Sequence, residues 1–522
     1  MDLKKSVIGI ELGSTRIKAV LLDENLLPVA SGSHEWENRL VDGVWTYTMQ
    51  DITHGIQSCY ADLKKDVRER FGVPVTQVAA IGVSAMMHGY LPFDDQWNLL
   101  TPFRTWRNTM TGAAAEELTK LFSFNIPQRW SIAHLYQAML NKEEHVPSIR
   151  HLTTLAGYIH FKLTGVHAVG VGEASGMFPI DSETNDYDAA MMAAFDQLPL
   201  SASMPWKLKQ LLPQVLLAGQ DAGTLTADGA AFLDPAGDLQ PGIPMCPAEG
   251  DAGTGMAATN SVRVKTGNVS AGTSDFAMVV VEKRPGVHRE IDMVTTPTGK
   301  PVAMVHCNNC TADINAWVTL FGQFAEAAGF PVDKGTLFTL LFRKALEGAP
   351  DGGGLMSVNY LSGEGVTDFN EGRPLFLRKP DAPVGLASFM RTHLMSALAT
   401  LKLGMDILAE EQVAISRMYG HGGYFKTPEV GQRMLSAAIN APVTVMQTAG
   451  EGGPYGMALL AAFRVYGQAG QALEDFLDQK VFATAEEKTL QATAEEVEGF
   501  NKYIEGYKQA LKAEKALLDA GY

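Results

Sequence analysis

The sequence predicts an α/β protein of two domains, and three observations support this fold class. The chain has 522 residues, too many for one hydrophobic core, so two domains of roughly 200 to 250 residues each are expected. Apolar segments with strand character alternate with segments of helical periodicity. A strand, a glycine-hydroxyl turn and a second strand occur near the N-terminus and again after residue 262, which indicates an internal duplication.

Composition and charge restrict the possible partners. Hydrophobic residues make up 46% of the chain and charged residues 19%, as in a globular protein. The net charge of -16 argues against nucleic acid or an anionic membrane as the main partner, because both require a basic face. No apolar run reaches the roughly 18 residues of a membrane span, and no secretory signal is evident. We therefore expect a cytoplasmic protein with a small-molecule ligand, and we leave open a homodimer.

The cysteines indicate a reducing compartment rather than a disulfide framework, because there are only four in so long a chain. Cys307 and Cys310 form one C-x-x-C pair. A zinc site normally needs a second pair of ligands at matching spacing, and the sequence offers none. We do not expect a metal at this pair.

The N-terminal segment has the pattern of a phosphate-binding hairpin. Residues 7–10 and 17–22 are predicted strands, and residues 11–15 form the polar turn between them. The turn contains Gly13, Ser14 and Thr15, whose backbone N–H groups and hydroxyls suit an anion, in particular phosphate. Lys18 follows in the second strand, where it either adds a positive charge to the site or points to solvent.

A second hairpin repeats this pattern. Residues 262–269 and 276–281 are predicted strands, and the turn between them contains Gly272, Thr273 and Ser274. One such turn alone is most simply an ordinary tight turn. Two of them in opposite halves of the chain favour two turns that bind one polyphosphate from two sides.

Asp251 is the strongest candidate for acid–base chemistry. Gly250, Ala252 and Gly253 surround it, so no bulky neighbour shields its carboxylate and the backbone can turn sharply. These properties suit a general base. The alternative is an ordinary loop acid.

A predicted strand at residues 78–84 leads into Met87, His88 and Gly89. Open α/β sheets place ligand contacts at the carboxyl ends of strands, although His88 taken alone is better explained as a structural histidine. Trp106 offers an aromatic face of the kind that sugar sites use, although single tryptophans often belong to a core.

The remaining pattern is mostly scaffold. A predicted strand at residues 415–419 leads into Gly422 and Gly423, which allow a flat ring to lie against the backbone. A further strand is predicted at residues 360–364, and residues 198–247 are predicted to be rich in loops. Capping boxes begin at Thr484 and Thr493, and a C-terminal docking helix follows. Helices are predicted at residues 116–122, 132–140, 152–163, 314–324 and 387–408, and a glycine loop that enters a helix at residues 451–460.

Taken in order, these motifs resemble the FGGY carbohydrate kinases, a branch of the actin, Hsp70 and sugar-kinase superfamily, over nearly the whole chain. Each motif is short, but their number, order and spacing make the combined signal specific. The resemblance implies two actin-like (ribonuclease H-like) domains with a ligand cleft between them. Because the second hairpin begins at residue 262, we place the boundary near Ala258, which gives domains of residues 1–258 and 259–522. The matching segments are IGIELGSTRIKAVLLD, AIGVSAMMHGYLPFD, GEASGMFPID, GDAG, SAGTS, NYLSGE, GHGGYFKTPEV and EGGPYGMALLAA.

The resemblance implies an ATP-dependent kinase for a ketopentose, D-xylulose or L-ribulose. It implies that Asp251 is the general base and that Glu11 lies near a Mg²⁺ ion. The alternatives are a kinase for another sugar or polyol, a catalytically weak sugar-sensing regulator, and a phosphatase or ATPase of the superfamily. Implied ATP contacts are Gly13, Ser14, Thr15, Lys18, Gly272, Thr273, Ser274, Gly422 and Gly423, and implied sugar contacts are Met87, His88, Gly89 and Trp106.

The sequence departs from the family pattern at several positions. Glu11 replaces the usual Asp, and Ala252 replaces an amide after the catalytic Asp. His134 and Gln137 stand where Lys and Trp are usual, and 308–309 is an Asn pair in place of a more glycine-like run. These departures concern the choice of sugar more than the reaction. The phosphorylated hydroxyl, the oligomeric state and any regulation stay open.

Overall fold

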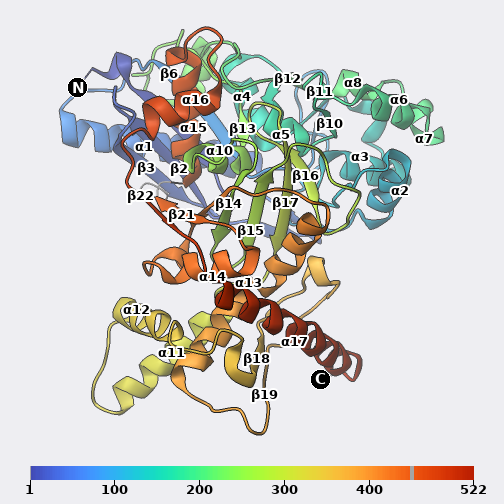
Figure 1. The fold of residues 1–522 in the computed structure, drawn as a ribbon. Helices are drawn as coiled ribbons and strands as arrows, with labels where there is room; N and C mark the ends of the chain where they lie inside the picture. Colours follow the sequence, from blue (N-terminus) through green and yellow to red (C-terminus); the bar gives the residue numbers. More distant parts are fainter. Residues whose placement is uncertain (1, 447–451, 522) are drawn as a thin grey trace. The chain divides into compact units, whose positions relative to one another are not determined.

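The computed structural model describes residues 2–446 and 452–521. Contacts divide the chain into two compact units, whose helices and strands are labelled in Figure 1. The first unit consists of Met1–Val262, Asp292–Val302 and Glu451–Thr484. The second unit consists of Arg263–Ile291, Ala303–Gly450 and Ala485–Tyr522. Two later segments thus return to the first unit.

The first unit is built around a five-stranded sheet in the order β13-β6-β1-β2-β3. Strand β1 is parallel to β6, and β6 is parallel to β13, whereas β2 pairs antiparallel with β1 and β3. The carboxyl ends of β1, β6 and β13 therefore lie at one edge. The strands are β1 (Val7–Leu12), β2 (Arg16–Leu22), β3 (Pro28–Glu35), β6 (Ala80–Ala85) and β13 (Glu249–Gly250).

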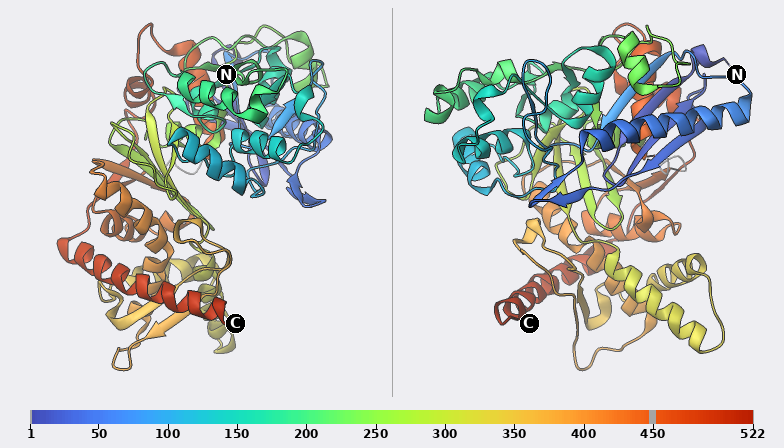
Figure 2. Two further views of the ribbon diagram at one scale, coloured as in Figure 1. Left: turned by 90° about the vertical axis from the view of Figure 1, so that its right-hand side faces the viewer. Right: turned by 180° about the vertical axis from the view of Figure 1, so that it is seen from behind.

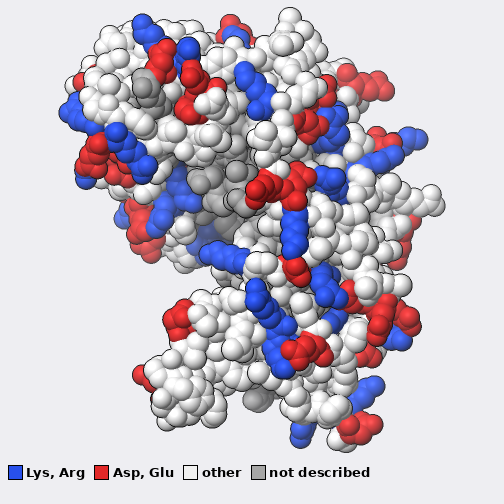
Figure 3. Space-filling view, turned by 60° about the vertical axis from the view of Figure 1, so that its left-hand side comes forward, with Lys and Arg blue, Asp and Glu red and all other residues white. Residues whose placement is uncertain are grey.

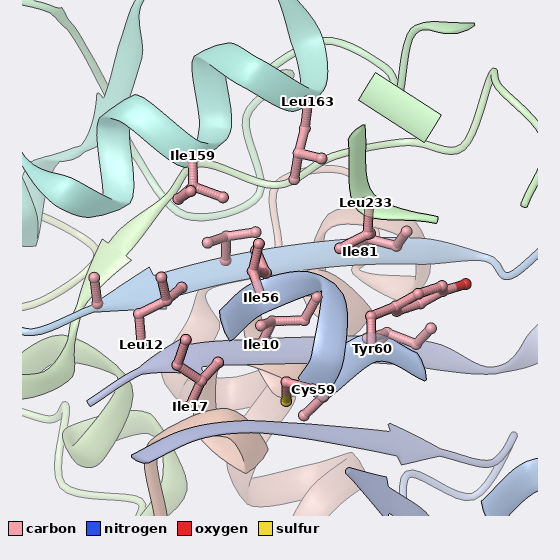
Figure 4. Close-up of a cluster of buried hydrophobic side chains, with 14 of the residues drawn as sticks. Ile10, Leu12, Ile17, Ile56, Cys59, Tyr60, Ile81, Ile159, Leu163 and Leu233 are labelled. Carbon is pink, nitrogen blue, oxygen red and sulfur yellow. The ribbon is translucent and has the colours of Figure 1, made fainter. Parts of the chain in front are cut away.

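The two faces of this sheet pack against different helices, because successive side chains of a strand point to opposite faces. Ile10 and Leu12 belong to a buried cluster with side chains of α1 (Met49–Phe71), α4 (Leu155–Thr164) and α9 (Ala227–Leu233), as Figure 4 shows. Helix α1 lies across β2 and β3 (Figure 2). On the other face, α15 (Gly452–Tyr466) packs so closely that a Cβ at Gly9 would lie 2.1 Å from the Pro454 carbonyl oxygen.

Shorter elements complete the first unit. They surround the sheet and include the segment that carries Asp251 at the start of α10. These elements are β4 (Arg39–Val41), β5 (Val44–Thr46), β7 (Leu91–Phe93), α2 (Gly112–Phe122), α3 (Ser131–Leu140), β8 (His151–Thr153), β9 (Ala168–Gly170), α5 (Val171–Ser175), β10 (Ile180–Asp181), β11 (Asp186–Tyr187), α6 (Ala189–Gln197), α7 (Pro199–Ala202), α8 (Leu208–Leu211), β12 (Gln214–Leu216), α10 (Asp251–Ala258), β16 (Asp292–Thr295) and α16 (Leu473–Phe476).

The second unit contains strands in the order β17-β15-β14-β20-β21-β22. Its helices pack mainly on one another and on the β18–β19 hairpin, and α13 is the central one. Its strands are β14 (Thr266–Ala271), β15 (Asp275–Val280), β17 (Pro301–Cys307), β18 (Leu355–Val358), β19 (Leu375–Arg378), β20 (Arg417–His421), β21 (Val443–Met446) and β22 (Glu487–Leu490). Its helices are α11 (Ala312–Ala327), α12 (Lys334–Ala345), α13 (Leu386–Glu410), α14 (Val430–Ile439) and α17 (Ala494–Asp519).

Most predicted elements are confirmed with shifted ends. Strand β1 continues to Leu12, since Glu11 and Leu12 pair with β2 and β6, so the turn is shorter than predicted. Strand β14 begins at Thr266 rather than residue 262. Residues 152–163 divide into β8 and α4, because Thr154 caps the helix at its start. The segment 198–247 contains α7, α8, β12 and α9.

Two predicted elements were wrong. Residues 360–364 are not a strand, because the Asn309 carboxamide oxygen accepts the N–H groups of Leu361 and Ser362 at 2.9 and 3.0 Å in place of a strand partner. The capping box at Thr484 starts no helix, because the following residues pair antiparallel with β21 as β22. The capping box at Thr493 is confirmed at the start of α17. Glu451, in the predicted glycine loop, lies outside the described residues.

Candidate active site

Three neighbouring strands of the first unit each deliver a predicted site segment to one edge of the sheet. In the register, Leu12 and Gly250 both lie opposite Ala85, the last residue of β6. Directly beyond these strand ends follow the turn at residues 13–15, the segment at 87–89, and Asp251. Residues more than 230 positions apart are therefore neighbours, as roughly expected for an open α/β sheet.

Asp251 is the first residue of α10 rather than a loop residue. The backbone N–H of Met87 donates a hydrogen bond to Asp251 Oδ1 at 3.3 Å, which joins the predicted base to the predicted sugar segment. The carboxylate keeps an exposed surface, but the protein atoms around it exclude much of the water. This desolvation raises the pKa of Asp251 to about 6, and the hydrogen bonds from backbone N–H groups only partly offset it. A carboxylate of this kind is suited to accept a proton near neutral pH.

His88 is buried and has a left-handed backbone with φ of 70°. This conformation is unusual for a residue other than glycine and is often found at functional sites. His88 Nδ1 lies 3.2 Å from the Gly176 carbonyl oxygen, and its ring stacks on Trp130 with centroids 6.3 Å apart. Gly89 has φ of 93°, and a Cβ there would lie 2.8 Å from the Arg104 carbonyl oxygen. The turn at Gly89 thus requires glycine, while His88 is held in one orientation.

Aromatic side chains support the turn at residues 13–15. Trp36 Nε1 donates a hydrogen bond to the Gly13 carbonyl oxygen at 2.7 Å, and the Tyr47 hydroxyl donates to the Ser14 carbonyl oxygen. The Trp36 and Tyr47 rings stack with centroids 4.1 Å apart. Trp106 Nε1 donates to Ser14 Oγ at 3.1 Å. The predicted sugar-facing tryptophan is therefore in contact with the predicted phosphate turn.

Glu11 and Lys18 lie directly opposite each other in the β1–β2 pair. Burial raises the pKa of Glu11 to about 8, and the nearby Asp251 charge adds to this, whereas Lys18 opposes it. Glu11 Oε2 is buried and accepts no hydrogen bond from the described residues. Gly453 leaves room for it, since a Cβ there would lie 1.3 Å from Glu11 Oε2.

Glu11 alone could supply one carboxylate ligand to a cation whose other ligands are phosphate oxygens and water. Within residues 2–446 and 452–521, no three His, Cys, Asp or Glu side chains are arranged to hold a metal ion. Mg²⁺ typically takes only one or two protein carboxylates, and phosphate oxygens and water complete its shell. The free Oε2 of Glu11 suits this mode of binding.

The second unit brings together its own predicted residues. Strands β14 and β20 are parallel, and Ser270 lies opposite His421, so the turn at residues 272–274 and the segment 422–423 follow neighbouring strand ends. Gly422 has φ of 97°, and a Cβ there would lie 2.4 Å from the Ala271 carbonyl oxygen. The close approach of these two segments therefore requires glycine at this position.

The start of α11 holds the second turn in place. Thr311 Oγ1 and the Thr311 N–H both donate to the Gly272 carbonyl oxygen, at 2.6 and 3.0 Å. The Cys310 N–H donates to the Thr273 carbonyl oxygen at 2.9 Å. Cys307 and Cys310 are free thiols that are buried next to Asp275. Burial and the Asp275 carboxylate raise the pKa of both thiols.

Several of these contacts were not predicted from the sequence. Trp36, Tyr47 and Thr311 belong to no recognised motif. Each donates a hydrogen bond to a backbone carbonyl oxygen of one of the two turns. For Thr311 the sequence offered one signal. The backbone carbonyl groups of the turn at residues 272–274 need hydrogen-bond donors, and Thr311 directly follows Cys310 of the C-x-x-C pair. No comparable signal pointed to Trp36 or Tyr47.

Both basic and acidic side chains are present across the face shown in Figure 3. In the described part of the chain, no helix has the length and apolar character needed to cross a membrane.

Comparison with known proteins covers most of the chain. The profile of the FGGY family of carbohydrate kinases, N-terminal domain, matches residues 6–257, and that of the C-terminal domain matches residues 267–465. A xylulose kinase of Lactococcus lactis is 19% identical over 532 residues, 97% of this chain and 96% of that protein. A xylulose kinase of Escherichia coli is 24% identical over 286 residues, which span 53% of this chain and 54% of that protein.

Solved structures share the fold. A xylulose kinase from Rhodospirillum rubrum superimposes with a TM-score of 0.78 at 17% identity, and the match covers 98% of this chain and 99% of the other. A ligand-bound xylulose kinase from Lactobacillus acidophilus gives 0.77 at 16% identity, covering 97% and 98%. These matches confirm the predicted class, an α/β protein with two actin-like domains.

Proposed function

Because this chain belongs to the FGGY family of carbohydrate kinases and is an ATP-dependent sugar kinase, we propose that its acceptor is a ketopentose, D-xylulose or L-ribulose. The sequence Met87-His88-Gly89, which resembles that of D-xylulose kinases, supports this choice. The observation that carries the kinase site is the hydrogen bond from the Met87 N–H to Asp251 Oδ1, since it joins the proposed sugar segment to the proposed base. Relatives named as xylulose kinases agree with the proposal.

In the proposed reaction, Asp251 accepts the proton of one sugar hydroxyl. The hydroxyl oxygen forms a bond to the γ-phosphorus of ATP as the bond to the β–γ bridging oxygen breaks, which gives a sugar phosphate and ADP. Most catalysis of phosphoryl transfer comes from positioning and from stabilisation of charge. The buried, left-handed His88 and the raised pKa of Asp251 supply a fixed acceptor site and a base.

We assign the nucleotide contacts to the two glycine-hydroxyl turns. Gly13, Ser14 and Thr15 in the first unit, and Gly272, Thr273 and Ser274 in the second, are proposed to bind the phosphates, with Lys18 as a nearby positive charge. Gly422 and Gly423 are proposed to contact adenosine. Glu11 would hold Mg²⁺, which neutralises charge on the phosphates when bound. The proposal also divides the chain into two functional domains, residues 1–258 and 259–522. This division differs from the two structural units, because segments 292–302 and 451–484 belong to the first unit.

Sugar-dependent release of ADP tests the proposal. We expect the wild-type protein to release ADP with a ketopentose at least as efficiently as with any ketohexose or polyol. Asp251→Asn should lose most of this turnover, roughly 10²–10⁴-fold, because base catalysis typically contributes that much, while ATP binding measured at equilibrium stays close to wild type.

Asp42→Asn is the matched control, because it makes the same chemical change at an exposed position outside the site. Undiminished turnover in Asp251→Asn would refute the role of the base. ATP hydrolysis that does not depend on sugar would instead favour a phosphatase or ATPase, and sugar binding without turnover would favour a regulator.

A further inference from the structure

Glu249 is a buried carboxylate two residues before Asp251, and the mechanism above does not use it. It lies in β13 and is 1% exposed. Its Oε1 accepts the N–H of Gly172 at 3.2 Å, and its Oε2 accepts the N–H of Glu173 at 2.9 Å. Both donors belong to α5, so one side chain links the strand that carries the base to this short helix.

Two glycines form a cradle around the Glu249 carboxylate. A Cβ at Gly170 would lie 2.1 Å from Oε1, and a Cβ at Gly172 would lie 2.5 Å from Oε2. At both positions the three nearest atoms that a methyl group would meet all belong to Glu249. The backbone of segment 170–172 is therefore shaped specifically around this carboxylate.

The same helix continues to His88. Gly176 directly follows α5, and its carbonyl oxygen is the partner of His88 Nδ1 at 3.2 Å. A Cβ at Gly176 would lie 2.7 Å from His88 Nδ1, so the two segments are in close contact. A path of hydrogen bonds thus leads from Glu249 through α5 and Gly176 to His88.

Helix α5 is also fixed from another side. The Ser175 hydroxyl donates to the Gly172 carbonyl oxygen at 2.6 Å, and the Thr295 N–H donates to Ser175 Oγ at 3.0 Å. Because α5 has only five residues, its own backbone hydrogen bonds are too few to hold it rigidly. Side-chain acceptors such as Glu249 must supply the rest.

We propose that Glu249 is a positioning residue for the sugar substrate. Its side chain fixes α5, so that His88 keeps its orientation relative to Asp251. This inference rests on the proposed function, because it assigns His88 to the sugar. Glu249 is a positioning residue rather than a catalytic one in this proposal, because its carboxylate oxygens accept the N–H groups of Gly172 and Glu173.

Substitution of Glu249 should act on the sugar and leave ATP unaffected. Glu249→Ala removes both acceptors, and we expect kcat/KM for the sugar to fall roughly 100-fold, the usual effect of a displacement of about 1 Å, while KM for ATP stays within about twofold. Glu249→Gln keeps one acceptor oxygen at nearly the same volume, so its loss should be smaller. Glu183→Ala, at an exposed glutamate, is the matched control.

The cradle allows a second test that does not depend on turnover. Gly172→Ala should lower the thermal midpoint in the wild-type background, because its methyl group meets the Glu249 carboxylate. In the Glu249→Ala background the same substitution should cost little, so the two changes should be strongly non-additive.

The outcomes separate the two proposals. If the wild-type protein phosphorylates no sugar, the proposed function fails, although the thermal cycle still reports the contact. If sugar turnover is normal in Glu249→Ala, or if KM for ATP rises as much as KM for the sugar, the positioning role is refuted. A lower thermal midpoint with unchanged sugar kinetics would show a structural role only and would also overturn the proposal.

Discussion

The indole of Trp106 donates a hydrogen bond to Ser14 Oγ, so a residue proposed to face the sugar holds a residue proposed to bind phosphate. The two belong to different motifs, separated by more than ninety positions. If both proposed roles hold, this contact gives the proposed acceptor and phosphate sites of the first unit a common support, and a change at one should be measurable at the other.

Trp106→Phe tests this shared support. The substitution keeps an aromatic face but removes the N–H donor, so we expect KM for ATP to rise about fivefold, since a side-chain hydrogen bond contributes about 1 kcal/mol. Trp206→Phe is the control, because it removes a buried indole donor to the Val146 carbonyl elsewhere. Steady-state kinetics with ATP varied at saturating sugar gives the result. A change confined to KM for the sugar would contradict the prediction.

The pH dependence of turnover should report Asp251. Its pKa is raised to about 6, and a base must be deprotonated to act. We therefore expect kcat/KM for the sugar to be level above about pH 7 and to fall about tenfold per unit well below pH 6. Initial rates between pH 5 and 8 would show this, with circular dichroism as a control for unfolding. A level profile down to pH 5 would argue against Asp251 as the base.

The segments that meet in the candidate site of the first unit could be predicted because their signals are local. A strand followed by Gly13, Met87 or Asp251 is visible in a short window, and the parallel arrangement of β1, β6 and β13 then brings the three strand ends together. The residues that hold these segments gave no such signal. Trp36, Tyr47 and Glu249 act through contacts between segments far apart in the chain, which no local pattern encodes.

Local patterns failed where a long-range partner changed the outcome. The sequence after Thr484 satisfies the rule for a helix start, but β21 offers unpaired backbone groups, so the segment forms β22. The segment at residues 360–364 has strand character, yet the Asn309 side chain takes its backbone donors. In both cases the backbone hydrogen bonds went to a partner that the sequence alone does not identify.

Gly422→Ala should destabilise the second unit. Its positive φ and the nearby Ala271 carbonyl leave no room for a methyl group, and a strained conformation of this kind costs about 1–3 kcal/mol. We expect a lower thermal midpoint and weaker ATP binding. Gly365→Ala is the control, because the position is exposed and a Cβ there meets no atom within 4 Å. Equal thermal midpoints for the two variants would show that the backbone at Gly422 relaxes easily.

Acid should destabilise the first unit through buried histidines. Burial lowers the pKa of His134 to about 3 and that of His160 to about 4, against 6.5 for the ordinary side chain. Below pH 6.5 the unfolded chain binds protons that the folded chain does not, so stability falls as the pH falls from 6.5 towards 4.

Thermal unfolding at several pH values measures this loss. His160→Gln should lessen it, because its amide N–H can still donate to the Ala222 carbonyl oxygen, which His160 Nε2 contacts at 3.0 Å, and it cannot be protonated in this range. Parallel curves for His160→Gln and the wild-type protein would contradict this assignment.

Helix α15 covers the sheet face from which Gly9 and Glu11 project, yet it is synthesised more than four hundred residues after β1. During translation this face therefore lacks α15 until more than four hundred further residues have been made. Completion of the first unit must wait for that helix, and we expect a polypeptide stopped near residue 258 to expose apolar sheet surface to other chains. Transiently exposed surface of this kind favours aggregation or binding by chaperones.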